Sequence, residues 1–426
     1  MAMQKRRSHK KSRRGCLNCK KWHTKCDESG PPCNNCILRN AKCEYSWAIE
    51  DTSSAVGMKP RRTLSRKLST GTSSSSAPSL CDPANLVLSE ARRRLELELM
   101  HCWSTTTYKS LCSVPEDHHY MQFTLPQEAL QYDFLMNGIF VSAALHKATM
   151  APEPEAKVYY NTAMELYNRA SVSFRKHLAK MDPGTHHMLY IFSSMAAFIN
   201  IAFSQCKFSS YDELNTLSTI AVAFDLLNGS VNIAQADFQR LLDSPVPVQA
   251  YYNYGRALDD ALDLETLGAI TRLEALTDLY NVHQYRSSPP LYSNDSSRER
   301  SVSVPPPVPW KDIVRLLQRC FAEDYRGVFR GFCFVFPGGA GPEFVAAVKA
   351  ADPMALMILM HWTVLLSRAQ TEYWWASGLG PRLAVGIWKA IGLSATTYPP
   401  PAIMLEPEWC DSVVWICSKL GLPEFI

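Results

Sequence analysis

Six cysteines lie between positions 16 and 43 of this 426-residue chain, and they restrict its fold more than any other feature of the sequence. Their spacing is C-x2-C-x6-C, then six residues, then C-x2-C-x6-C again. Each C-x2-C pair fits the first turn of a short helix, with both sulfurs on one side. Apolar residues are scarce in this stretch, so a hydrophobic core cannot fold it. The six are Cys16, Cys19, Cys26, Cys33, Cys36 and Cys43.

Three kinds of fold use clustered thiols in this way. A disulfide knot needs an oxidising compartment, and the charged N-terminus does not resemble a secretory signal. A metal-storage protein is cysteine-rich throughout, whereas the other eight cysteines here are scattered. Structural zinc takes four thiolates in a tetrahedron, so six sulfurs complete two sites when two of them are shared. Metal-binding energy then replaces the missing core, and the sequence favours this third interpretation.

The cysteine block resembles the fungal Zn2Cys6 binuclear zinc cluster at every cysteine spacing, and Pro31 matches the proline in that family's central loop. The resemblance implies two Zn²⁺ ions that share Cys16 and Cys33 as bridging ligands. It also implies double-stranded DNA as a partner, because that family places its first short helix in the major groove. The implied ligand sets are Cys16, Cys19, Cys26 and Cys33 for one ion, and Cys16, Cys33, Cys36 and Cys43 for the other.

The segment C-K-K-W-H-T-K-C, residues 19–26, corresponds to the part of that family which reads a CGG- or TCG-like half-site. Lysine suits guanine, because guanine O6 and N7 both accept hydrogen bonds in the major groove. We therefore expect Lys20, Lys21 and Lys25 to contact bases or phosphates. His23 can donate an imidazole N–H to guanine. Trp22 stands where the family more often has a basic residue, and we expect it to pack on the sugar-phosphate backbone or to alter the preferred site.

The run KRRSHKKSRR at residues 5–14 is strongly basic, and its last two residues, Arg13 and Arg14, are further DNA-binding candidates. Such a run is typical of a nuclear localisation signal or of an arm that binds the DNA backbone, so we expect the protein in the nucleus. Residues 1–70 hold 17 Lys and Arg against 5 Asp and Glu, whereas the remainder is net acidic. This asymmetry predicts that DNA affinity resides in the N-terminal part and falls with salt.

Composition divides the chain into four parts. We assign 1–14 to the basic arm, 15–45 to a Zn2Cys6 DNA-binding domain, 46–85 to a disordered linker rich in Ser and Thr, and 86–426 to a mainly all-α regulatory domain with a flexible insertion at 287–309. Gly229 is expected to end one helix of that domain. Periodicity and flanking Pro and Gly predict helices near 129–149, 154–180, 186–206, 211–228, 233–243, 246–281, 310–329, 341–376 and 379–392.

Leu88, Leu95, Leu99, Cys102 and Trp103 fall on one face of an earlier helix. This helix admits two interpretations. It is a dimer helix of two heptads, which makes the protein a homodimer, or it is the first core helix of the body. The sequence favours the core helix.

The body resembles the regulatory region of fungal sterol uptake control proteins and of related secondary-metabolism regulators. The resemblance rests on LELELMHCWSTTTYKSL, FDLLNGSVNIAQADFQRLLDSP and ADPMALMILMHWTVLLSRAQTEYWWASGLGPRLAVGIWKAIG. It implies an all-helical bundle that holds a sterol or another apolar ligand. Methionines and indoles suit such a ligand, although the same residues at helical spacing also suit a core. The candidates for the pocket are Met354, Met357, Met360, Trp362, Trp374 and Trp375.

Catalytic signatures such as H-E-x-x-H, G-x-S-x-G and G-x-x-x-x-G-K do not occur in the sequence, so we do not expect an enzyme. The most apolar runs, MLYIFSSMAAFINIAF and MALMILMHWTVLL, are shorter than the roughly 18 residues of a membrane span. We expect them to be buried helices, and we expect no span.

Together these features predict a nuclear, zinc-dependent transcription factor that binds DNA sequence-specifically and acts with the transcription machinery on RNA polymerase II genes. The first hypothesis is an activator of sterol-pathway genes. The second is a pathway-specific regulator of a secondary-metabolite biosynthetic gene cluster. The third is a zinc-folded protein-interaction module without DNA readout, against which the lysine-rich helix argues.

Overall fold

The computed structural model describes most of the helical body and parts of the cysteine block. The described residues are 15–24, 26–27, 33, 35–36, 39, 41–45, 83–206, 213–256, 261–287, 308–394 and 401–423. The basic arm at 1–14, residues 46–82 of the expected linker and residues 288–307 of the expected insertion lie outside these ranges.

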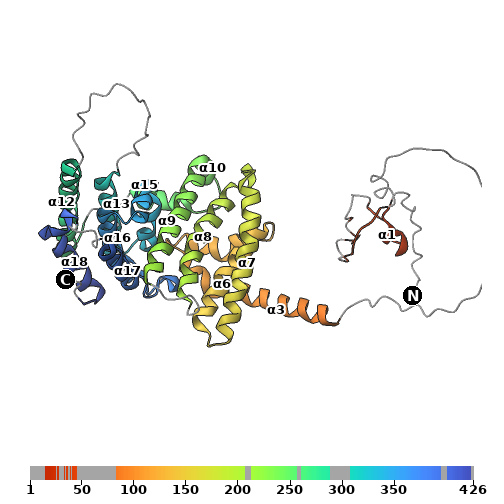
Figure 1. Cartoon of the computed structure of the whole chain (residues 1–426). Coiled ribbons are helices and arrows are strands. Elements are labelled where there is room, and N and C mark those ends of the chain that lie inside the picture. Colours follow the sequence, from red (N-terminus) through yellow and green to blue (C-terminus); the bar gives the residue numbers. More distant parts are fainter. Residues whose placement is uncertain are drawn as a thin grey trace, which may run out of the picture. The chain divides into compact units, whose positions relative to one another are not determined.

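The chain divides into two compact units, residues 1–78 and 79–426. The first unit contains the cysteine block and its short helix α1 (Leu17–Lys21). In the second unit, all regular structure within the described residues is helical, which confirms the predicted all-α body (Figure 1). That body begins with helix α3 at Pro83, close to the boundary expected from composition.

The helices of the body follow one another with short connections, and several single turns of tighter or wider helix, labelled η, lie between them. The first half contains α3 (Pro83–Thr105), η1 (Thr107–Leu111), α4 (Asp117–His119), η2 (Tyr120–Thr124), α5 (Leu125–Ala129), α6 (Asp133–Met150), α7 (Glu155–Leu178), η3 (Pro183–Thr185), α8 (His186–Gln205), α9 (Glu213–Ala236), α10 (Phe238–Leu242) and α11 (Val248–Arg256). The second half contains α12 (Leu264–Ser287), α13 (Trp310–Arg326), η4 (Arg330–Phe334), α14 (Val335–Gly339), α15 (Gly341–Lys349), α16 (Pro353–Ala369), η5 (Trp374–Ala376), α17 (Leu379–Ser394), η6 (Ala402–Leu405) and α18 (Pro407–Leu420).

Neighbouring helices pack as pairs: α6 lies against α7, α8 against α9, and α16 against α17 (Figure 1). Two buried tryptophans outside these pairs connect separate segments of the body, because each indole N–H donates to a backbone carbonyl oxygen elsewhere in the chain. Trp103 donates to the Met121 oxygen at 2.9 Å. Trp375 of η5 donates to the Ser110 oxygen of η1 at 2.8 Å, which fixes the segment after α16 against the start of the body. Leu99 and Trp103 of α3 are buried in this core, so α3 contributes to it as the sequence favours.

Several helix boundaries differ from the sequence expectation; for example, the helix expected at 233–243 is the end of α9 followed by α10. Helix α9 continues through Gly229 to Ala236, because a single glycine costs only about 1 kcal/mol in a helix whose other residues pack well. The stretch expected as one helix at 246–281 is two, since α11 ends at Arg256 and Asp263 begins α12 by accepting the Thr266 N–H at 2.9 Å. Asp352 divides the stretch at 341–376 in the same way, and it accepts the Met354 N–H at 2.9 Å.

Two helices of the body are long and apolar enough to cross a membrane by length and composition, at Pro183–Gln205 and Thr216–Ala236. The first is longer than the apolar run that the sequence analysis judged too short for a span. The first segment contains α8 and the second lies within α9, and these two helices pack against each other in the body. The shares of their apolar windows that are buried are 61% and 39%.

Candidate metal centre

Helix α1 begins and ends through interactions that the cysteine spacing makes possible. Cys16 is its N-cap, and the Cys16 thiol accepts the Cys19 N–H at 3.3 Å. At the other end His23 has a left-handed backbone with φ of 55°. The His23 N–H donates to the Lys20 oxygen at 3.3 Å and the Thr24 N–H to the Cys19 oxygen at 3.0 Å, a pattern that commonly ends helices. The backbone therefore turns sharply after α1 and carries the chain back toward the cysteines.

The structure brings all six cysteine sulfurs together. They form two groups of four, and within each group the sulfurs lie within 4.8 Å of one another. The Cys16 sulfur lies 3.7 Å from that of Cys33 and 3.6 Å from that of Cys36. The groups are Cys16, Cys19, Cys26 and Cys33, and Cys16, Cys33, Cys36 and Cys43. Cys16 and Cys33 thus belong to both groups.

This arrangement fits a pair of zinc ions. A tetrahedral zinc with sulfurs about 2.3 Å away places neighbouring sulfurs about 3.8 Å apart, close to the separations around Cys16 and Cys33. Two groups of four that share two sulfurs supply the ligands of two ions. The donor set consists of thiols alone, which suits a structural zinc site closed to substrate.

The two halves of the block repeat their hydrogen bonds at an offset of 17 residues. The N–H of Cys16 donates to the Cys26 sulfur at 3.5 Å, and the N–H of Cys33 donates to the Cys43 sulfur at 3.3 Å. The Thr24 N–H donates to the oxygen of Cys19, and in the second half the N–H at position 41 donates to the oxygen at position 36 at 2.9 Å. The sequence repeat is therefore also a repeat of backbone geometry.

The pKa values of the thiols distinguish the shared cysteines from their neighbours. Burial favours the protonated thiol at Cys16, but hydrogen bonds from the Cys19 N–H and from neighbouring thiols outweigh it and lower the Cys16 pKa. The pKa of Cys33 is lowered in the same way, and there the backbone donor is Cys36. In contrast, burial and neighbouring thiols raise the pKa of Cys19 to about 12. Zinc binds cysteine as the thiolate, so metal binding at these sites releases protons from the thiols.

The expected DNA-contacting residues divide into exposed and half-buried ones. Lys20 and Lys21, in the last turn of α1, are exposed, and so is His23. Trp22 is half-buried and packs against the cysteine cluster. The guanidinium carbon of Arg39 lies 4.8 Å from the centroid of the Trp22 ring. No sequence motif points to Arg39, although the 17-residue repeat pairs position 39 with position 22. Lys25, Arg13 and Arg14 lie outside the described residues.

Five of the six residues expected to line an apolar pocket are at most 2% exposed and belong to the packed core of the body. Trp362, for example, packs edge-on to Phe224 with ring centroids 5.3 Å apart, and its indole N–H donates to the Cys333 oxygen at 2.9 Å. The five are Met354, Met357, Met360, Trp362 and Trp375.

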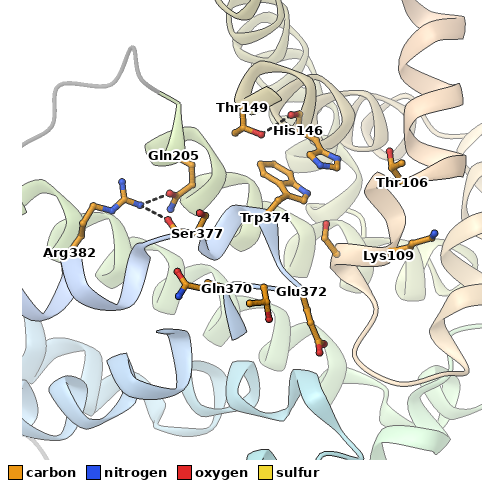
Figure 2. A pocket seen from close by; sticks show the side chains of 12 residues that line it. Thr106, Lys109, His146, Thr149, Gln205, Gln370, Glu372, Trp374, Ser377 and Arg382 are labelled. Atoms are coloured by element: carbon orange, nitrogen blue, oxygen red, sulfur yellow. Dashed lines mark hydrogen bonds between the residues drawn. The ribbon is translucent and has the colours of Figure 1, made fainter. Parts of the chain in front are cut away.

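The sixth, Trp374, lines a polar cavity of about 680 Å³ (Figure 2). Its ring stacks on the imidazole of His146, with centroids 4.7 Å apart and planes at 7°. Burial lowers the pKa of His146 to about 4, so this imidazole is neutral at pH 7. Lys109 and Arg382 bring positive charge to the wall. A cavity with this lining suits a hydrophilic molecule better than a sterol. The full lining is Thr106, Lys109, Ser110, His146, Thr149, Gln205, Gln370, Thr371, Glu372, Trp374, Ser377 and Arg382.

Comparison with known proteins identifies the cysteine block. Residues 14–50 match the family model of the fungal Zn(2)-Cys(6) binuclear cluster domain. A Zn(2)-C6 fungal-type transcription factor of Gibberella zeae is 32% identical over 237 residues, which are 46% of this chain and 47% of that protein. The Zn(2)-C6 fungal-type transcription factor afumD of Aspergillus fumigatus is 30% identical over 152 residues, 35% of this chain and 36% of that protein.

A further match covers a much shorter stretch of the chain, and the name of that relative states a function. Sterol uptake control protein 2 of Candida albicans is 51% identical over 41 residues, 10% of this chain and 6% of that protein. The chain therefore spans less than half of the length of each of these three relatives.

Proposed function

We propose, from the premise that residues 14–50 are a fungal Zn(2)-Cys(6) binuclear cluster domain, that this chain is a nuclear transcription regulator which binds DNA sequence-specifically. The observation that carries the proposal is the pair of four-sulfur groups that share two cysteines. Such a centre holds two zinc ions and folds a segment without a hydrophobic core, and that segment presents a lysine-rich helix. The relatives named as transcription factors support the same class, and a non-enzymatic role agrees with it.

We assign the zinc ligands by their membership in the two groups. Cys16 and Cys33, which belong to both groups, bridge the ions. Cys19 and Cys26 complete one site, and the remaining pair at positions 36 and 43 completes the other. Each ion then has four thiolate ligands, as a tetrahedral structural zinc requires.

We assign DNA readout to the exposed residues at the end of α1. Lys20 and Lys21 are placed to donate to guanine or to phosphate, and His23 adds an imidazole on the turn that follows. Lys25, Arg13 and Arg14 lie outside the described residues, and we keep them as DNA-binding candidates because of the basic sequence around them. A CGG- or TCG-like half-site is the expected target.

The regulated pathway has two candidates. The match to sterol uptake control protein 2 covers only 41 residues, about the length of the cluster domain, whereas the match to the Gibberella factor extends over 237 residues. In the body, five of the six expected pocket residues are packed in the core, and the cavity beside Trp374 is polar. These observations count against a sterol-responsive activator, and we therefore prefer the second candidate, the regulator of a biosynthetic gene cluster.

The test is a selection from random DNA with the full-length, zinc-loaded chain at about 0.15 M salt. We expect one CGG- or TCG-containing half-site to be enriched. A Lys20→Ala/Lys21→Ala variant that still holds two zinc ions is expected to lose the enrichment. Genes downstream of the recovered site then distinguish sterol biosynthesis from a single biosynthetic cluster. A zinc-loaded chain that enriches no sequence would contradict sequence-specific readout and would favour the protein-interaction module.

A further inference from the structure

Trp22 and Arg39 form a contact between the two halves of the cysteine block. Trp22 follows the last residue of α1, is half-buried and packs against the cysteine cluster. The guanidinium carbon of Arg39 lies over the indole ring, 4.8 Å from its centroid. Arg39 itself is exposed. A guanidinium in this position is attracted to the negative face of the ring, and Trp is the aromatic side chain that binds cations best in this way.

The internal repeat explains why these two side chains meet. Residues 17 positions apart are equivalent in the two halves: Cys16 corresponds to Cys33, position 19 to position 36, and Trp22 to Arg39. The hydrogen bonds of the two halves follow this offset as well. Trp22 and Arg39 therefore stand at equivalent positions of two similar turns, and they approach each other where the halves meet.

We propose that Trp22 is a positioning residue, and that it holds Arg39 in place to bind a DNA phosphate. This inference rests on the proposed DNA-binding function and adds a contact from the second half of the block to that of α1. A guanidinium held over a ring still has N–H groups that can donate a charge-assisted hydrogen bond to a phosphate. The ring also restricts the Arg39 side chain before DNA arrives, which reduces the entropy lost on binding.

The charge around this contact favours the same assignment. Lys20 and Lys21, which directly precede Trp22, are both exposed in the last turn of α1. Arg39 therefore extends a positive surface that α1 begins. Lys42 is a second exposed cation of the same half, but its ammonium group pairs with the Glu44 carboxylate at 3.0 Å. Because it lacks the aromatic platform and is already paired, Lys42 provides a matched control for the loss of one charge.

The experiment measures binding of the full-length, zinc-loaded chain to two labelled duplexes, one with a CGG triplet and one with that triplet scrambled. Affinities are measured between about 50 and about 200 mM salt. For Arg39→Ala we expect about tenfold weaker binding to both duplexes, as for the loss of one charge-assisted hydrogen bond. The slope of log K against log salt should become shallower by about 0.9, the value for one phosphate. Lys42→Ala should leave the slope within error of the wild type.

The role of Trp22 is tested by a double-mutant cycle. Trp22→Ala is expected to reproduce most of the Arg39→Ala effect on both duplexes, and the double variant should bind no more weakly than Arg39→Ala alone. Trp22→Phe, which retains a weaker aromatic platform, should fall between Trp22→Ala and the wild type. Each variant is first checked for two zinc ions per chain, so that unfolding of the cluster is not mistaken for loss of a contact.

The outcomes separate this inference from the function on which it rests. If the wild type binds neither duplex, the proposed DNA-binding function fails and the inference fails with it. If the wild type binds but Arg39→Ala behaves like Lys42→Ala, only the phosphate contact is refuted. If Trp22→Ala abolishes the preference for CGG and Arg39→Ala does not, Trp22 reads bases itself and the positioning role is wrong.

Discussion

His361 makes the stability of the helical body sensitive to acid. It is fully buried in α16, where its ring stacks on Trp415 with centroids 5.6 Å apart, and Nδ1 lies 2.8 Å from the Met357 carbonyl oxygen. Burial lowers the pKa of His361 from 6.5 to about 4, and the charge of Arg272 acts in the same direction. Between these pH values the unfolded chain binds a proton that the folded chain excludes. The stability is therefore full above pH 6.5 and falls as the pH falls toward 4.

The size of the effect follows from the shift. Each pKa unit corresponds to about 1.4 kcal/mol, so His361 accounts for a loss of about 3 kcal/mol between pH 6.5 and pH 4. Urea unfolding of the full-length chain, followed by tryptophan fluorescence at several pH values, measures this loss. His361→Leu should be less sensitive to acid by about that amount, while His146, whose pKa is lowered to about 4 by burial, contributes a remaining dependence. Equal pH dependence in His361→Leu and the wild type would refute the reasoning.

Substitutions at three further places test the zinc ligands, the turn after α1 and a buried ion pair. Cys33→Ala removes a ligand from both sulfur groups, so elemental analysis should find less than one tightly bound zinc per chain. Cys26→Ala removes a ligand from one group only and should retain one zinc. Equal losses of zinc in the two variants would contradict the shared role of Cys33. His23→Gly removes the steric strain of a side chain on a left-handed backbone and should stabilise the zinc-loaded cluster by about 1 kcal/mol. The bound zinc should then resist removal by a chelator better than in the wild type. Lower resistance than the wild type would contradict this expectation. Glu323 is fully buried, accepts the Phe329 N–H and pairs with Arg326 at 2.6 Å. Glu323→Ala should therefore lower the free energy of unfolding in urea by about 3 kcal/mol. A loss below about 1 kcal/mol would show that this pair does not stabilise the fold.

The cysteine spacing predicts the metal centre because its geometry is local. Two C-x2-C pairs and two returning cysteines bring six sulfurs together once the chain turns back after each pair. The turn itself is less evident from sequence, since glycine is the usual residue at the left-handed position that His23 occupies. The contact of Trp22 with Arg39 is also missed by motif reasoning, although the 17-residue repeat contains the information that positions 22 and 39 are equivalent.

In the body, periodicity predicts most helices but not where they stop. Asp263 and Asp352 interrupt stretches that look continuous, because their carboxylates accept the first backbone N–H groups of a new helix. Periodicity also does not distinguish a pocket wall from a packed core. Met357 and Trp362 satisfy both patterns, and only the tertiary structure assigns them to the core. Trp374, which follows the end of α16, lines a cavity whose polar lining comes partly from distant segments.

The most direct test of the metal-dependent DNA reader measures zinc and DNA binding on the same sample. Reduced, metal-free, full-length chain is titrated with Zn²⁺ while bound metal and affinity for a CGG-containing duplex are followed together. We expect two ions to bind per chain and DNA binding to appear only as they do. Saturation at one ion per chain, or DNA binding that persists in excess chelator, would contradict a binuclear cluster that folds the DNA-reading helix.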